Sequence, residues 1–166
     1  MKLFGNKKNL IRIVHEPGTY MDCTPLHGKW CTITLVGQDV GYARVGMISS
    51  GKDYILFQFR DKKGLVSKAY VKDIVEVKMT ERMLAKEQPL AAQEWDEDIN
   101  PFTYFVGSRC DIHMHQTHMF EATPGFFGAK VLFIDQENQL MRVRENSRQF
   151  NLNLFMICGL MESNYQ

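Results

Sequence analysis

A glycine-led strand pattern occurs twice in this chain and constrains its fold more than any other feature. Residues 28–35 contain glycine, two polar or amphipathic residues, cysteine and then alternating apolar residues, and residues 107–114 repeat that order. The second copy continues in step, because residues 128–134, a five-residue polar turn and residues 140–144 match the first hairpin. Self-similarity of this kind predicts duplicated structural units. We therefore expect two small all-β barrels in tandem instead of one large sandwich.

Strand signals fill the first copy at short intervals. Residues 29–35 alternate polar and apolar with a period of two, so Cys31, Ile33 and Leu35 should point inward. The spacing of the β-rich runs and turns is typical of a small barrel. The expected strands are 10–14 as a leading arm, 29–35, 42–48, 54–60, 65–71 and 74–77, with turns at 49–53 and 61–64, and 150–160 closes the second copy.

Formal charge is distributed unevenly along the 166 residues. Residues 1–79 hold 13 Lys and Arg against 7 Asp and Glu, residues 80–101 hold 2 against 6, and residues 102–166 hold 5 against 6. Residues 80–90 are rich in helix formers after Thr80, a candidate N-cap, and an acidic stretch follows them. These features predict a basic N-terminal barrel with a leading arm (1–79), an acidic, partly helical, solvated linker (80–101) and a C-terminal barrel (102–166).

The first copy resembles the KOW and Tudor group of small Src-homology-3-like barrels. The likeness lies in Gly28 before the first strand, Gly37 and Gly41 in the first loop, the strand at 44–48 and the hairpin after it. Residues 107–160 resemble the same group less closely. The resemblance implies tandem KOW/Tudor-like barrels that bind nucleic acid or protein, some of which hold modified peptides in aromatic cages. In size and plan the chain is also similar to phage-encoded DNA-binding modifiers of transcription.

Composition excludes several classes of protein. Hydrophobic residues make up 45% and aromatic residues 11%, which argues against global disorder. No apolar run approaches the roughly 18 to 20 residues of a membrane span, and no export signal follows Met1. The four cysteines, Cys23, Cys31, Cys110 and Cys158, form no closely spaced pair, so we expect free, mostly buried thiols in a reducing cytoplasm.

The basic first barrel is the candidate nucleic-acid interface. Cations attract phosphates, and aromatic side chains between them can stack on bases or pack against sugars. Trp30 is expected on the outward face beside Lys29. Two structural alternatives stay open. The cations could serve solubility alone, and Trp30 could pack against the N-terminal segment. The candidate binding residues are Lys7, Lys8, Arg12, Lys29, Trp30, Arg44, Lys52, Arg60, Lys62, Lys63, Lys68 and Lys72.

Weak metal-ligand candidates lie in the second barrel. Cys110, His113, His115 and His118 carry the side chains that zinc prefers, with Asp111 among them. On a strand, Cys110 points away from the face that His113 and His115 share, so four ligands do not converge. No metal site and no cofactor is therefore predicted, and exposed histidines that titrate are the default expectation.

No catalytic motif is found in the sequence. A nucleophile elbow, a phosphate-binding glycine loop, a metalloprotease helix and a paired-cysteine site are all missing. Residues 125–128 are interpreted as a turn with buried aromatics. Tyr42, Tyr54 and Phe57 are candidates for an aromatic cage, although core packing is the favoured interpretation.

The favoured function is therefore non-enzymatic binding of double-stranded DNA. Binding with little sequence preference would modulate transcription or nucleoid organisation in the cytoplasm or nucleoid of a phage-infected host. A protein-interaction adaptor aimed at host transcription or nucleoid proteins is one alternative, with the histidine-containing second barrel as its contact surface. RNA binding is another, because small barrels accept either nucleic acid.

Overall fold

A computed structural model of the chain describes residues 9–37, 41–115 and 125–163. Its strands are β1 (Arg12–Val14), β2 (Trp30–Leu35), β3 (Gly41–Ser50), β4 (Tyr54–Phe59), β5 (Lys62–Ser67), β6 (Val71–Glu76), β7 (Arg109–Met114), β8 (Gly125–Asp135), β9 (Leu140–Glu145), β10 (Arg148–Asn153) and β11 (Ile157–Glu162). The helical turns are η1 (Thr24–Leu26), η2 (Lys68–Tyr70), α1 (Glu81–Leu84), η3 (Pro101–Phe105) and η4 (Leu154–Met156).

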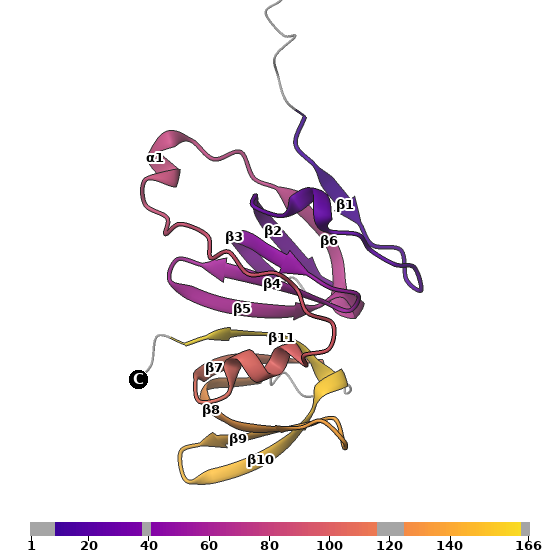
Figure 1. Cartoon of the computed structure of the whole chain (residues 1–166), viewed down its shortest axis with the longest axis vertical. Helices are drawn as coiled ribbons and strands as arrows, with labels where there is room; N and C mark the ends of the chain where they lie inside the picture. The colour runs from indigo at the N-terminus through magenta and orange to yellow at the C-terminus, as the bar shows by residue number, and fades with distance from the viewer. Residues whose placement is uncertain (1–8, 38–40, 116–124, 164–166) are drawn as a thin grey trace, which may run out of the picture.

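All eleven strands belong to one antiparallel sheet (Figure 1). Their spatial order is β1-β6-β2-β3-β4-β5-β11-β7-β8-β9-β10, so the C-terminal strand lies in the middle. The all-β fold class predicted from the sequence is confirmed. The sheet is not closed in the described part of the chain, where β1 and β10 form its two edges.

The strands repeat one backbone plan twice. Repeat one (β2 to β6) and repeat two (β7 to β11) each run through four consecutive antiparallel strands, a 3-10 turn and a fifth strand that returns to pair with the first. A helical turn with a proline near its start precedes each repeat, and a glycine with positive φ, Gly28 or Gly107, follows that turn. The duplicated strand pattern predicted from the sequence therefore corresponds to duplicated structure.

Two glycines show how closely the copies match. A Cβ on Gly41 would lie 2.0 Å from the carbonyl oxygen of Ile33, and a Cβ on Gly125 would lie 1.6 Å from that of Ile112. Each glycine lets the second strand of its repeat cross the first at close range. The prediction of a turn at 125–128 is therefore wrong, since Gly125 begins β8 and the aromatic Phe127 is 68% exposed.

Repeat one also departs from prediction at its third turn. The turn expected at 61–64 lies earlier, because β5 already starts at Lys62 and Arg60 takes the positive φ of the connection. Gly64 lies within β5 opposite Phe57, and a Cβ on it would come within 2.2 Å of the phenyl ring. This glycine accommodates a core side chain and does not form a turn.

Each repeat has an apolar core that includes side chains from the other repeat. The first core contains Cys31, Ile33 and Leu35, which point inward as predicted, and also Cys158 from β11. The second core contains residues of β7 to β11 together with Leu65 from β5. Because β5 and β11 pair directly, the repeats share one sheet and exchange core side chains across the seam.

All four cysteines are free and buried, as expected from their spacing. Burial raises the pKa of Cys23 and Cys158 to about 11 and that of Cys31 and Cys110 to about 12. These thiols are therefore protonated at neutral pH and serve as small apolar core groups.

The segment between the repeats begins with a short helix. Thr80 caps it as predicted, because its side-chain oxygen accepts a hydrogen bond from the backbone N–H of Met83 at 3.2 Å. The helix ends at Leu84, earlier than the sequence suggests. In the described residues no helix has the length and apolar character to cross a membrane.

The rest of this segment packs along repeat one. Gln58, buried in β4, donates from Nε2 to the carbonyl oxygen of Pro89 and accepts at Oε1 from the N–H of Ala91, both at 3.0 Å. Further along, Glu97 accepts from the N–H of Lys52 at 2.8 Å, and Trp95 packs against the second core. This stretch is therefore attached to the repeats at several points, while its acidic residues Glu94, Asp96, Glu97 and Asp98 stay exposed, as expected of a solvated connector.

Candidate nucleic-acid interface

The outer face of repeat two carries three cations side by side, which we call the cationic row. Arg109 of β7 is the cross-strand partner of Lys130 of β8, and Lys130 is the partner of Arg144 of β9. Neighbouring strands lie about 4.8 Å apart. Because side chains alternate along a strand and the adjacent Val131 and Val143 are fully buried, the three cations point away from the core.

No ion pair in the described part of the chain involves the cationic row. The described residues form the ion pairs Arg12–Asp73 and Lys29–Glu76, which both lie in the N-terminal part of the chain. Asp111 of repeat two is engaged elsewhere, because its Oδ1 accepts from the backbone N–H of Gly128 at 2.8 Å. Like charges directly opposite each other destabilise a sheet, so an external anion on this face would be stabilising.

Arg142 extends the row on β9 and is held in one orientation. Its Nε donates to Oε1 of Gln149 at 3.1 Å and its Nη1 donates to Oδ1 of Asn151 at 3.0 Å. Both acceptors are neutral amides, so the guanidinium keeps its charge and has further N–H groups to donate. Its cross-strand partner Phe133 is 53% exposed. An oriented arginine beside an exposed ring can contact a phosphate and an adjacent sugar or base.

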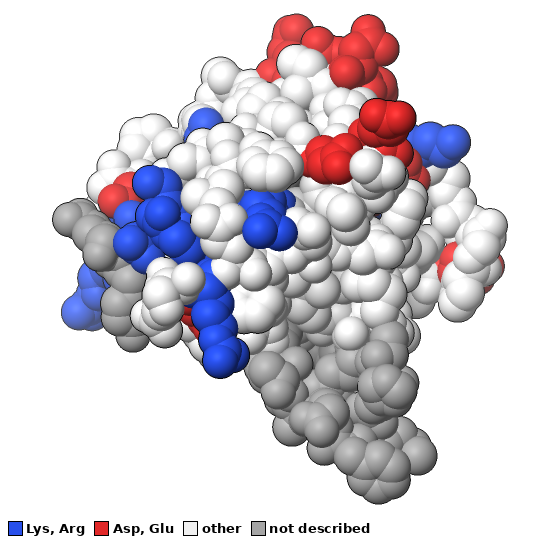
Figure 2. Space-filling model, turned by 90° about the horizontal axis from the view of Figure 1, so that it is seen from below, with Lys and Arg blue, Asp and Glu red and all other residues white. Residues whose placement is uncertain are grey.

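The row continues across the seam into repeat one. Lys62, at the start of β5, lines a shallow hollow with Arg109 and Lys130. Glu162 brings one negative charge to the same hollow, and its Oε1 accepts a hydrogen bond from the backbone N–H of Lys63 at 2.7 Å. The view from below shows Lys and Arg gathered on one side of this end of the molecule, and Asp and Glu gathered on another (Figure 2).

The matching face of repeat one is neutral and covered. Trp30, Gly46 and Gln58 are cross-strand partners there, in the positions that the row takes in repeat two. A Cβ on Gly46 would lie 2.1 Å from a methyl carbon of Leu90, so the connecting segment lies directly over this face. Trp30 lies on the outer face of the sheet, as expected from alternation with Cys31, but it is only 9% exposed, so the expectation of an exposed indole is wrong.

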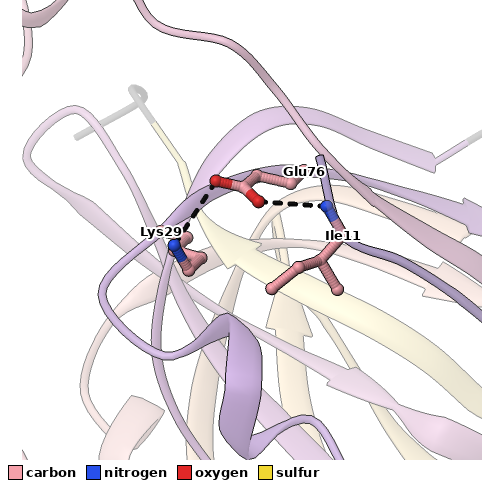
Figure 3. A network of polar contacts seen from close by, with 3 residues as sticks. All are labelled: Ile11, Lys29 and Glu76. Carbon is pink, nitrogen blue, oxygen red and sulfur yellow. Dashed lines mark hydrogen bonds and ion pairs between the residues drawn. The ribbon is translucent and has the colours of Figure 1, made fainter. Parts of the chain in front are cut away.

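Two cations predicted to bind phosphate are paired within the fold. Nη2 of Arg12 lies 3.1 Å from Oδ2 of Asp73. Nζ of Lys29 lies 3.5 Å from Oε2 of Glu76, whose Oε1 accepts from the backbone N–H of Ile11 (Figure 3). These ion pairs connect β1 and the start of β2 to β6. The positive charges of Arg12 and Lys29 are therefore paired with carboxylates within the fold.

Lys68 is a third predicted cation that the fold withdraws from the surface. It is 4% exposed, its Nζ donates to the carbonyl oxygen of Met21 at 2.6 Å, and it lies 4.7 Å from the centre of the Tyr20 ring. Burial lowers the pKa of its ammonium group. A lysine in this position cannot reach a phosphate without leaving its site.

The other predicted cations are scattered. Arg44 and Arg60 line a hollow beside α1, whereas Lys52 and Lys72 are exposed elsewhere on repeat one. Nζ of Lys63 lies 3.4 Å from Oε1 of Gln93. Lys7 and Lys8 lie outside the described residues. Of the predicted cations that the structure describes, Lys62 is the one that lies with the cationic row.

The weak metal candidates do not come together in the described residues. Cys110 is fully buried in the second core, whereas His113 is half-buried and its pKa is lowered by burial. The ring of His115 lies 5.1 Å from that of Tyr70, and His118 lies outside the described residues. No group of three potential ligands that could hold a metal ion occurs in the part of the chain that is described.

The three aromatic candidates pack internally, as favoured from the sequence. Tyr42 and Phe57 lie 4.7 Å apart between ring centres, and Tyr54 packs edge-on against Phe102 at 5.2 Å. Phe57 is fully buried. Burial raises the pKa of Tyr54 to about 12, so its hydroxyl stays protonated at neutral pH.

The cationic row was missed because the second module is nearly neutral in sum. One signal in the sequence could have found it. If Cys110 points inward as its counterpart Cys31 does, alternation places Arg109 outward, and the same argument from the apolar residues Val131 and Val143 places Lys130 and Arg144 outward. To predict a charged surface from a β-rich sequence, the charges have to be counted for each face of the sheet and not for each segment of the chain.

No protein-family model matches the chain, and searches of curated proteins and of solved structures found no match. The description of the site therefore depends on its own geometry. That geometry defines an all-β protein with a cationic row that forms no ion pair in the described residues.

Proposed function

We propose that this protein binds double-stranded DNA through the cationic row, with little sequence preference, and thereby modulates transcription or nucleoid organisation. The observation that carries the proposal is the alignment of Arg109, Lys130 and Arg144 on neighbouring strands, where none of them forms an ion pair in the described residues. Such a surface attracts the phosphate backbone and gains affinity from counterion release.

Weak sequence preference follows from the shape of the face. The row lies on a sheet surface, and the described residues offer no long helix to enter the major groove. Contacts to phosphate position a protein on DNA but carry no sequence information. Phe133 beside Arg142 adds an apolar contact that every sugar or base can accept.

We also propose that each repeat is a small barrel of the Src-homology-3-like type related to KOW and Tudor modules. Support comes from the five strands in order, the 3-10 turn before the fifth strand, and the return of that strand to the first. In this proposal repeat two supplies the binding face, and repeat one supports it and contributes Lys62.

The test is a salt-dependent titration of short DNA duplexes of unrelated sequence with the full chain and the triple variant R109A/K130A/R144A. Loss of three phosphate contacts should reduce the slope of log affinity against log salt by about 2.7. Affinity at low salt should fall on the order of 100-fold. The two duplex sequences should bind equally well.

The matched control is K52A/K72A/K78A, which removes three exposed cations from the other module. Its slope and affinity should change far less than those of the row variant. A larger loss in the control would put the interface on repeat one and overturn the proposed site. Failure of the wild-type chain to bind duplex DNA at low salt, or preferential binding of single-stranded RNA in competition, would overturn the proposed function.

A further inference from the structure

A second group of cations surrounds a hollow on repeat one. Arg44 of β3 and Arg60 of the β4–β5 turn face Arg82 and Lys86, which lie one turn apart on α1 and its extension. The hollow measures about 460 Å³, and Glu87 is its one acidic lining residue. In Figure 1, α1 stands beside the end of the sheet where β4 leads into β5.

Both arginines hold a backbone conformation that suits other residues better. Arg44 has φ 53° and Arg60 has φ 56°. The matching positions of repeat two are taken by Gly128, with φ 66°, and Asn146, with φ 57°. Glycine and asparagine adopt this region readily, whereas a long side chain crowds the backbone there. Repeat two thus shows which residues the backbone plan prefers, and repeat one has an arginine at both places.

Four cations line this hollow against one carboxylate. The two ion pairs of the described residues involve none of its cations. Oε2 of Glu87 is buried without a hydrogen-bond partner, so this oxygen accepts no hydrogen bond from the arginines beside it. Guanidinium groups present a planar fork of N–H donors that matches phosphate oxygens, and strained residues often mark binding sites.

We propose that this hollow is a binding site for adjoining phosphate groups, separate from the cationic row. Three arginines and a lysine provide the donors, and the volume is in the range of small-ligand sites. The phosphates belong either to a free polyphosphate chain or to successive nucleotides of a nucleic acid. Arg44 and Arg60 hold the ligand from the sheet, while Arg82 and Lys86 hold it from α1.

The experiment is calorimetric titration of the full chain with tripolyphosphate at low salt. The test variant is R44G/R60N, which installs the residues that repeat two uses at these positions. Affinity for tripolyphosphate should fall about tenfold for each arginine lost. The control K72A/K78A removes two exposed cations elsewhere and should bind almost as tightly as the wild type.

Stability provides a second measurement that moves in the opposite direction. Because glycine and asparagine suit positive φ, R44G/R60N should unfold at the same denaturant concentration as the wild type or at a higher one. Weaker binding would then not be a consequence of misfolding. The variant E87Q removes the lining carboxylate and should bind tripolyphosphate severalfold more tightly.

A duplex DNA arm separates the two sources of phosphate. If R44G/R60N also loses affinity for DNA, the site contacts the nucleic-acid backbone, and if DNA affinity is kept, its ligand is a free polyphosphate. Both outcomes support the site. Absence of tripolyphosphate binding to the wild type, or equal binding by R44G/R60N, overturns it. The row variant R109A/K130A/R144A should keep its tripolyphosphate affinity, which distinguishes this inference from the DNA-binding proposal.

Discussion

The same sheet face has opposite character in the two repeats. In repeat two it presents Arg109, Lys130 and Arg144 to solvent. In repeat one the matching positions hold Trp30, Gly46 and Gln58, and the connecting segment covers them. One backbone plan therefore supports a closed, structural face and an open, cationic face.

The difference shows that the formal charge of a segment is a poor guide to its surface. Residues 1–79 hold six more cations than anions (13 − 7 = 6), yet Arg12 and Lys29 are ion-paired and Lys68 is buried. Residues 102–166 hold one more anion than cations (6 − 5 = 1), yet four of their five cations share one face. What a ligand encounters depends on which side of each strand a charge occupies.

Shortening the side chain of Leu65, at the seam between β5 and β11, should have the largest effect on stability. It also tests whether the two repeats unfold independently. Leu65 of β5 is 1% exposed and packs in the core of repeat two. L65A should lower the free energy of unfolding by about 2–5 kcal/mol, because it leaves a cavity. Since the two cores share residues, Cys31 and Cys110 should become reactive at the same denaturant concentration, as measured by thiol labelling and peptide mass spectrometry.

The control for this experiment is V36A, at a residue that is 53% exposed. It should change stability by less than about 0.5 kcal/mol. Labelling of Cys110 at a denaturant concentration where Cys31 stays protected would show that repeat two unfolds alone, and would contradict a shared cooperative unit.

The matched glycines sharpen the comparison at the level of the backbone. G41A and G125A should each destabilise the fold by about 1–3 kcal/mol, because the new methyl group meets a carbonyl oxygen of the neighbouring strand. G125A should be the more damaging, since its contact is closer and its φ is 149°. Urea denaturation measures both. G37A, where nothing lies within 4 Å of the new Cβ, isolates the cost of positive φ alone.

The smallest expected effect concerns pH. Burial lowers the pKa of His27 in repeat one and of His113 in repeat two below the ordinary value. The unfolded chain therefore binds protons more readily near pH 6, and stability should decline as pH falls from about 7 to 5. H27Q and H113Q should each flatten this dependence in urea midpoints measured across that range. An unchanged profile in both variants would show that other groups govern it.

Much of the fold was predictable because alternation and repetition are local signals. The inward positions of Cys31 and Ile33 and the cap at Thr80 all followed from neighbouring residues. The role of Gly64 did not, because a glycine that makes room for the ring of Phe57 looks the same in sequence as a glycine in a turn.

The candidate site was harder to predict because it depends on what covers each face. Trp30 was expected to be exposed, yet Leu90 and its neighbours lie on that face, 60 residues further along the chain (90 − 30 = 60). Pairing of Lys29 with Glu76 likewise joins distant segments. Contacts of this kind carry no local signature, so the order of charges along the chain could not reveal which cations remain available.

The central place of β11 has a consequence for synthesis. The last described strand fills the gap between β5 and β7 and delivers Cys158 to the first core. A nascent chain emerging from its N-terminus must therefore wait for β11 before β5 gains its second neighbour and Leu65 is enclosed. Until β11 has been synthesised, the β5 edge of repeat one stays open to non-native pairing.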